Sequence, residues 1–136
     1  MKVLIIGPNF FSYTKAISKE INKRSVQCFT FNELHSNGVV TKIGYRLNLD
    51  FLFKDKINLH RAKVFRFIDD NQISDVLFIS PEVVSDGFLL EVKKRSRVHL
   101  YMWDGFKNKK NTLSVLKYFN TKSSFDMFDC QHYGMN

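Results

Sequence analysis

The sequence predicts an α/β protein of three layers, with helices on both faces of a parallel, five-stranded, Rossmann-like sheet in the order 2-1-3-4-5. Short apolar runs alternate with amphipathic segments along the whole chain. Residues 3–6 are continuously apolar, as in a central strand that is covered on both faces. The length of 136 residues, without an internal repeat or a low-complexity tract, fits a single domain.

The first strand is predicted over residues 2–6, where Gly7 and Pro8 end it. Ser12 can then cap a helix. Four residues recur at helical spacing, so we expect them on its buried side: Tyr13, Ala16, Ile17 and Ile21. The second strand is predicted over residues 26–31, and an Asn-Gly turn pair follows it.

Residues 41–70 are the longest segment with a helical pattern, and we expect a break near residues 50–56. Its predicted buried side consists of Ile43, Leu47, Phe51, Val64, Phe65 and Ile68. Its outer side is basic through Lys42, Arg46, Lys54, Lys56, Arg61, Lys63 and Arg66. We expect this outer side to face anionic lipid or a phosphorylated ligand.

The remaining elements continue the alternation. A strand at residues 75–80 is stopped by Pro81, and Ser85 or Asp86 starts a helix that buries Phe88, Leu89 and Val92. The fourth strand covers residues 98–103, and Leu113, Leu116 and Phe119 mark a short helix. A fifth strand at 122–125 leads to a last helical turn at 126–133, which Gly134 closes.

The composition sets limits on the function. Lys and Arg outnumber Asp and Glu by 21 to 13, so the surface suits phosphate-bearing partners, although a basic surface can also serve solubility alone. No window is long and apolar enough for a signal peptide or a membrane span, and the two cysteines are far apart. These features predict a cytoplasmic protein without a metal site, and they leave open a peripheral contact with the inner face of an anionic membrane.

In parallel α/β sheets, ligands bind at the carboxyl ends of the strands. This rule nominates the segments that follow the first, third and fourth strands: GPNFFSY, SPEVVSDG and WDGFKNKK. The first segment lacks the glycines of a dinucleotide site, and Glu33 after the second strand is only a weak sign of a ribose-binding acid. A phosphate-binding loop, a phosphoacceptor aspartate after the first strand and a nucleophile elbow are all missing.

Two stretches resemble bacterial glycosyltransferases of the GT-B type that build lipopolysaccharide and capsule, including the group related to the spore-maturation protein CgeB. One is the opening, MKVLIIGPNFFSYTKAISKEI. The other runs from residue 98 to the last residue, where a W-D-S-like turn, a basic loop, an F-D-x-x-D segment and a Y-G pair recur. Gly105 stands where the W-D-S-like turn usually has serine, so the turn lacks a hydroxyl.

The resemblance implies the acceptor-side domain of a two-domain enzyme, present here as a fragment, a truncated product or a free-standing domain. Such a half is expected to be inactive alone and to bind no cofactor itself, since a nucleotide sugar would be the donor held by the missing half. An oligomer partner could replace that half. The alternative is a non-catalytic basic α/β module for a nucleotide, a nucleic acid or a protein. The sequence contains no nucleic-acid recognition motif, and its basic helices lack interleaved exposed aromatic residues. Both observations argue against nucleic acid.

Asp104 is the candidate catalytic residue, as a general base that deprotonates a sugar hydroxyl. We expect it to line a cleft with Trp103, where partial desolvation would raise its pKa. The candidate acceptor-binding residues are Asn9, Phe10, Ser12, Tyr13, Ser80, Glu82, Trp103 and Lys107. Structural roles stand beside these functions: Trp103 can pack against the end of the sheet, Asp104 can cap a turn, and the lysines can form a solvated loop.

Overall fold

The computed structural model describes residues 1–8, 12–34, 41, 43–44, 47, 49–106 and 109–136. Its strands are β1 (Lys2–Gly7), β2 (Gln27–Asn32), β3 (Asp75–Ile79), β4 (Arg97–Met102) and β5 (Thr121–Ser124). Its helices are α1 (Tyr13–Asn22), α3 (Lys54–Asn71), α4 (Asp86–Lys93), α5 (Lys110–Val115) and α6 (Met127–Tyr133), with short 3-10 helices η1 (Asp50–Phe53) and η3 (Leu116–Tyr118).

The five strands form one parallel sheet in the order β2-β1-β3-β4-β5, which confirms the predicted order. Leu4 lies beside Phe29 of β2 and Val76 of β3, so β1 is the strand from which the sheet winds both ways. At the outer edge of β5, the backbone N–H of Asn136 donates to the Lys122 carbonyl at 2.9 Å, and the Ser124 N–H donates to the Asn136 carbonyl at 3.0 Å.

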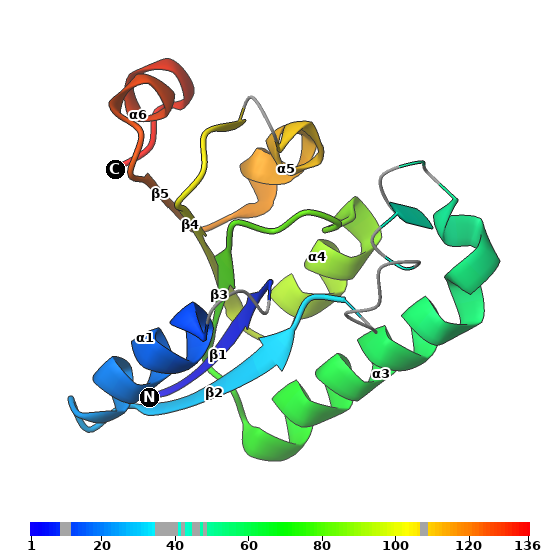
Figure 1. Cartoon of the computed structure of the whole chain (residues 1–136). Helices are drawn as coiled ribbons and strands as arrows, with labels where there is room; N and C mark the ends of the chain where they lie inside the picture. The colour runs from blue at the N-terminus through cyan, green and yellow to red at the C-terminus, as the bar shows by residue number, and fades with distance from the viewer. Residues whose placement is uncertain (9–11, 35–40, 42, 45–46, 48, 107–108) are drawn as a thin grey trace.

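The helices form two layers around the sheet. Figure 1 shows α1 on one face and α3 and α4 on the other. The larger core lies on the side of α3 and α4 and contains Leu4, Ile68 and Phe78. Several phenylalanine rings belong to it or pack against it, in edge-to-face pairs such as Phe78 with Phe119, whose centroids are 5.7 Å apart. The abundance of phenylalanine in the sequence therefore reflects this core.

The prediction for α1 was partly wrong. Tyr13 is 56% exposed and Ala16 is exposed too, while Thr14 and Ser18 are buried against the sheet. Ser18 can be buried because its hydroxyl donates to the Cys28 carbonyl at 3.1 Å. Ser12 precedes the helix with a positive φ of 60°, and its side chain makes no capping hydrogen bond.

The long helical segment is interrupted as predicted, since η1 ends at Phe53 and α3 begins at Lys54. Val64 and Ile68 are buried, and Phe65 packs against the same core. The prediction of burial is wrong for three residues before α3: Ile43, Leu47 and Phe51 are 49%, 62% and 65% exposed. They lie between β2 and α3 in the sequence, before or within η1. Among the described residues, no helix combines the length and apolar character needed to cross a bilayer.

The later elements follow the sequence prediction closely. Ser85 caps α4, since its hydroxyl accepts a hydrogen bond from the Phe88 N–H at 3.4 Å. Leu89 and Val92 are buried, and Phe88 is partly buried against the same core. Gly134 ends α6 with a φ of 60°, in the left-handed conformation that glycine adopts without strain.

Candidate functional site

The segments that leave the carboxyl ends of β1 to β4 are tied together by hydrogen bonds. The Glu33 N–H donates to the Gly7 carbonyl at 3.1 Å, which joins the ends of β2 and β1. The Trp103 N–H donates to the Ser80 hydroxyl at 2.9 Å, which joins the ends of β4 and β3. At the edge where parallel sheets bind ligands, these hydrogen bonds therefore link described residues of neighbouring strand ends.

Glu33 clamps the loop that follows β3. Its Oε1 accepts hydrogen bonds from the backbone N–H groups of Glu82 and Val83, at 2.8 and 2.7 Å. The pKa of Glu33 is raised from 4.5 to about 7, chiefly by burial of the carboxylate and to a smaller degree by the nearby Glu82 charge. The two backbone N–H groups and Lys109 act in the opposite direction but do not compensate for the burial. Glu33 therefore titrates close to neutral pH.

An ion pair extends this clamp to the segment after β4. The Lys109 ammonium lies 2.7 Å from the Glu82 carboxylate, and the Lys109 side chain is only 9% exposed. Beside it, the Thr112 hydroxyl donates to the Pro81 carbonyl at 2.8 Å. Glu82 was predicted from the sequence to bind a ligand, and the structure gives its carboxylate Lys109 as a partner.

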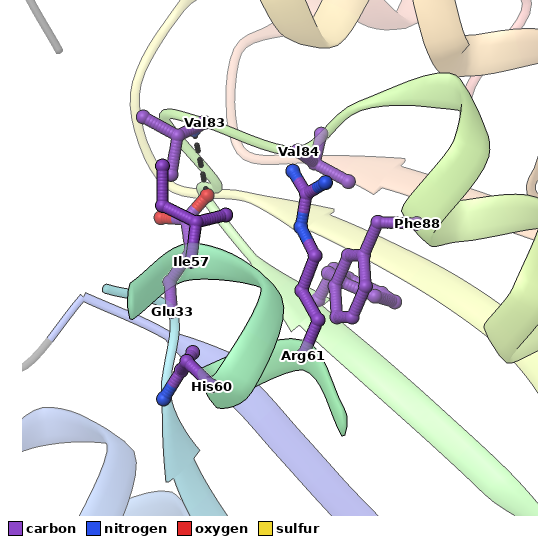
Figure 2. A pocket seen from close by; sticks show the side chains of 8 residues that line it. Glu33, Ile57, His60, Arg61, Val83, Val84 and Phe88 are labelled. Atoms are coloured by element: carbon purple, nitrogen blue, oxygen red, sulfur yellow. Dashed lines mark hydrogen bonds between the residues drawn. The ribbon is translucent and has the colours of Figure 1, made fainter. Parts of the chain in front are cut away.

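A small pocket opens beside the Glu33 clamp (Figure 2). It has a volume of about 380 Å³, which includes space open to solvent, and is lined by Glu33, Ile57, His60, Arg61, Phe78, Val83, Val84 and Phe88. A ring nitrogen of His60, Nε2, lies 2.9 Å from the Asn32 carbonyl. The Arg61 guanidinium lies 5.4 Å from the centre of the Phe88 ring and pairs with no carboxylate that the structure describes. The pocket thus offers a small polar group the Glu33 carboxylate as an acceptor and the Arg61 guanidinium as a cation.

Trp103 lies on the other face of the sheet, beside α1. Its ring contacts the smaller core of Val3, Ile5, Cys28 and Ile79. Its ring centroid lies 5.9 Å from that of Tyr13, in an edge-to-face arrangement. The packing role that we considered for Trp103 is therefore present, and its aromatic edge remains partly exposed beside Tyr13.

Asp104 is exposed, so the desolvated setting that we predicted for its carboxylate is absent. Its neighbour Gly105 lies close to two other carboxylates: a Cβ on Gly105 would be 3.2 Å from Asp126 and 3.7 Å from Asp129. Asp129 is buried and accepts a hydrogen bond from the Phe106 N–H at 3.1 Å. The W-D-G turn and the F-D-x-x-D segment therefore lie side by side.

The structure brings together Tyr13, Ser80, Glu82 and Trp103 at one edge of the sheet. Ser80 is fully buried, and its hydroxyl supports the Trp103 backbone. Ser12 is exposed at the start of α1. The predictions for Asn9, Phe10 and Lys107 fall outside the described residues.

Sequence reasoning missed the clamp formed by Glu33 and the burial of Lys109 and Asp129. The position of Glu33 directly after β2 was the available signal, since the ends of β2 and β3 both flank β1. Among the described residues, no cluster of three or more His, Cys, Asp or Glu side chains could hold a metal ion. Comparison with models of known protein families gives no match to this sequence, and comparison with curated proteins gives none either.

Proposed function

We propose that this chain is the acceptor-binding half of a GT-B glycosyltransferase that builds cell-surface polysaccharide or lipopolysaccharide. One observation carries the proposal: the two separate parts of the resembling motif meet in space. Gly105 of the W-D-G turn lies against Asp126 and Asp129 of the F-D-x-x-D segment, and the Phe106 N–H bonds to Asp129. They meet at the carboxyl ends of β4 and β5, the edge of the sheet where ligands bind.

In this proposal the acceptor sugar lies over Tyr13 and Trp103 and reaches toward Glu82, while buried Ser80 supports the Trp103 backbone. Tyr13 is 56% exposed beside Trp103, and the negative π face of an aromatic ring suits the C–H face of a sugar ring. Asp104 is the general base, because its exposed carboxylate can take a proton from an acceptor hydroxyl as that hydroxyl attacks the donor. The nucleotide sugar is held by a second domain, so this chain contributes acceptor binding and no turnover.

Binding to the isolated chain tests the proposal. Trp103 is the sole tryptophan, so its fluorescence reports on this surface without a label. We expect delipidated core oligosaccharide from lipopolysaccharide to change the Trp103 emission and to shift backbone NMR signals of Tyr13 and Glu82. UDP-sugars alone should shift neither. Binding of a UDP-sugar or of an RNA oligonucleotide, without oligosaccharide binding, would instead support the basic binding module.

The role of Asp104 requires an active two-domain enzyme that carries the same turn. There, replacing the aspartate that corresponds to Asp104 with asparagine should abolish transfer and leave the melting temperature nearly unchanged. Retained transfer would exclude the general-base role. Loss of folding would show that the aspartate is a structural cap of the turn.

A further inference from the structure

The connection between β2 and α3 exposes a group of large apolar side chains. Phe51 and Leu52 of η1 are 65% and 64% exposed, and Leu59 on the second turn of α3 is 60% exposed. Ile43, Leu47 and Leu49, which precede η1, are 49%, 62% and 36% exposed. A group of large apolar side chains exposed together on a folded surface indicates a binding site for a membrane or for another protein.

Short-range contacts hold these residues to one another and to η1. The Leu49 N–H donates to the Gly44 carbonyl at 2.8 Å, and the Leu52 N–H donates to the Leu49 carbonyl at 3.1 Å. Gly44 lies directly against the Phe53 ring, since a Cβ at this position would be 2.7 Å from it. We call the five residues Ile43, Leu47, Leu49, Phe51 and Leu52 the apolar tip.

Cations line α3 next to the apolar tip. Lys56, Lys63 and Arg66 are exposed and recur at helical spacing, so with Leu59 they share one side of the helix. None of the three pairs with a carboxylate among the described residues. Lys54 adds a fourth exposed cation where η1 meets α3.

Acidic residues are few near the apolar tip. Asp55 is the one exposed carboxylate in the first three turns of α3. Asp69 and Asp70 lie at the far end of the helix, and Asp69 is paired with Arg95 at 3.2 Å. Asp70 is about 21 Å along the helix axis from Lys56, at 1.5 Å per residue. The exposed cations therefore run along α3 from the apolar tip as far as Arg66, and the acidic residues of its last turn follow them.

We propose that the apolar tip and the adjoining side of α3 bind the surface of an anionic membrane. Phe51 and Leu52 enter the boundary between headgroups and acyl chains, and Lys56, Lys63 and Arg66 contact lipid phosphates. Apolar side chains next to basic ones are the pattern of segments that lie in a membrane interface. A purely electrostatic contact would need the cations alone, and a purely apolar interface between proteins would not need the row of unpaired cations. This surface lies on α3 and does not depend on the catalytic proposal.

Vesicle co-flotation of the full chain tests the membrane surface. The wild type should bind vesicles that contain phosphatidylglycerol and bind phosphatidylcholine vesicles at least tenfold more weakly, with the difference shrinking as salt is raised. Phe51→Ser/Leu52→Ser and Lys56→Gln/Lys63→Gln should each weaken binding to the anionic vesicles about tenfold or more. All four side chains are exposed, so circular dichroism and melting temperature should match the wild type.

Two matched control variants separate this surface from overall charge and hydrophobicity. Lys15→Gln/Lys19→Gln removes two exposed cations from α1, and Met127→Ser/Phe128→Ser removes two exposed apolar side chains from α6. Both should bind anionic vesicles as the wild type does. If Lys15→Gln/Lys19→Gln weakens binding as much as Lys56→Gln/Lys63→Gln, net charge explains the binding and the proposed surface is wrong.

Two further measurements distinguish membrane insertion from binding of a soluble phosphate. In the Phe51→Trp variant, lipids brominated on their acyl chains should quench the fluorescence of the new tryptophan. The same lipids should not quench the fluorescence of Trp103 in the wild type. Short-chain phosphatidylglycerol below its micelle concentration should shift the NMR signals of Lys56 and Lys63 weakly or not at all. Strong binding of this soluble lipid, unaffected by Phe51→Ser/Leu52→Ser, would show an anion site and overturn the membrane surface.

Discussion

Replacing Glu33 with glutamine should remove the pH dependence that its buried carboxylate imposes on stability. Glutamine keeps the shape and one oxygen, and Oε1 of Glu33 already accepts hydrogen bonds from both the Glu82 and the Val83 N–H groups. The substitution removes the titratable carboxyl group of Glu33. Because the side chain is clamped between two loops, any difference between the two proteins reports on the ionisation of Glu33 within the folded structure.

The expected magnitude follows from the pKa of Glu33, which burial raises from 4.5 to about 7. The folded protein therefore binds more protons than the unfolded chain between these pH values, so the free energy of unfolding falls as pH rises. A pKa difference of this size corresponds to about 3 kcal/mol, at about 1.4 kcal/mol for each tenfold change in proton affinity. The contribution of Glu33 is fully present below pH 4.5 and is lost as pH rises through 7.

Urea unfolding of the wild type and of Glu33→Gln at several pH values between 4 and 8 measures this difference. The variant should be close to the wild type at pH 4 and more stable than it by about 3 kcal/mol at pH 8. Other titrating groups are shared by both proteins, so most of their effect cancels in the difference. A difference that stays within about 1 kcal/mol across this range, or a wild type that gains relative stability as pH rises, would refute the reasoning.

The remaining predictions concern three other positions. Ser80→Ala should lower the free energy of unfolding by about 1–3 kcal/mol, because the Trp103 N–H loses its buried acceptor; urea unfolding within about 0.5 kcal/mol of the wild type would contradict this. Gly134→Ala should cost about 1–2 kcal/mol at a φ of 60°, and Gly134→Asn less; equal melting temperatures would show that the end of α6 relaxes. Burial raises the pKa of Asp75, but hydrogen bonds from Ser74, Arg97 and His99 outweigh it and hold the pKa below 3.8. Ionised Asp75 therefore stabilises the fold above pH 3.8, and this contribution is lost as pH falls through the lower folded-state pKa. Asp75→Asn should cost about 1–3 kcal/mol at pH 7, with a gap that narrows below pH 4; a constant gap from pH 7 to pH 3 would contradict this.

The sequence by itself determined the fold class and the strand order, and it nominated the carboxyl edge of the sheet for the site. Burial on both faces of a strand leaves a continuous apolar run, and a helix leaves a 3.6-residue period, so both can be read from neighbouring residues. Parallel strands joined by helices then allow few orders, and the order found was the one expected. Ser80, Glu82 and Trp103 were nominated together because the ends of parallel strands share an edge, and their role in binding a ligand stays a prediction.

The tertiary structure alone decided which side chains meet at that edge and which apolar residues stay exposed. Glu33 clamps backbone groups 49 and 50 residues away, and no local pattern records such a pairing. Ser18 is buried while Ala16 is exposed, because a carbonyl of β2 satisfies the Ser18 hydroxyl. Phe51 fits a helical apolar pattern yet lies exposed, because periodicity shows which residues share a side and not whether a partner covers that side.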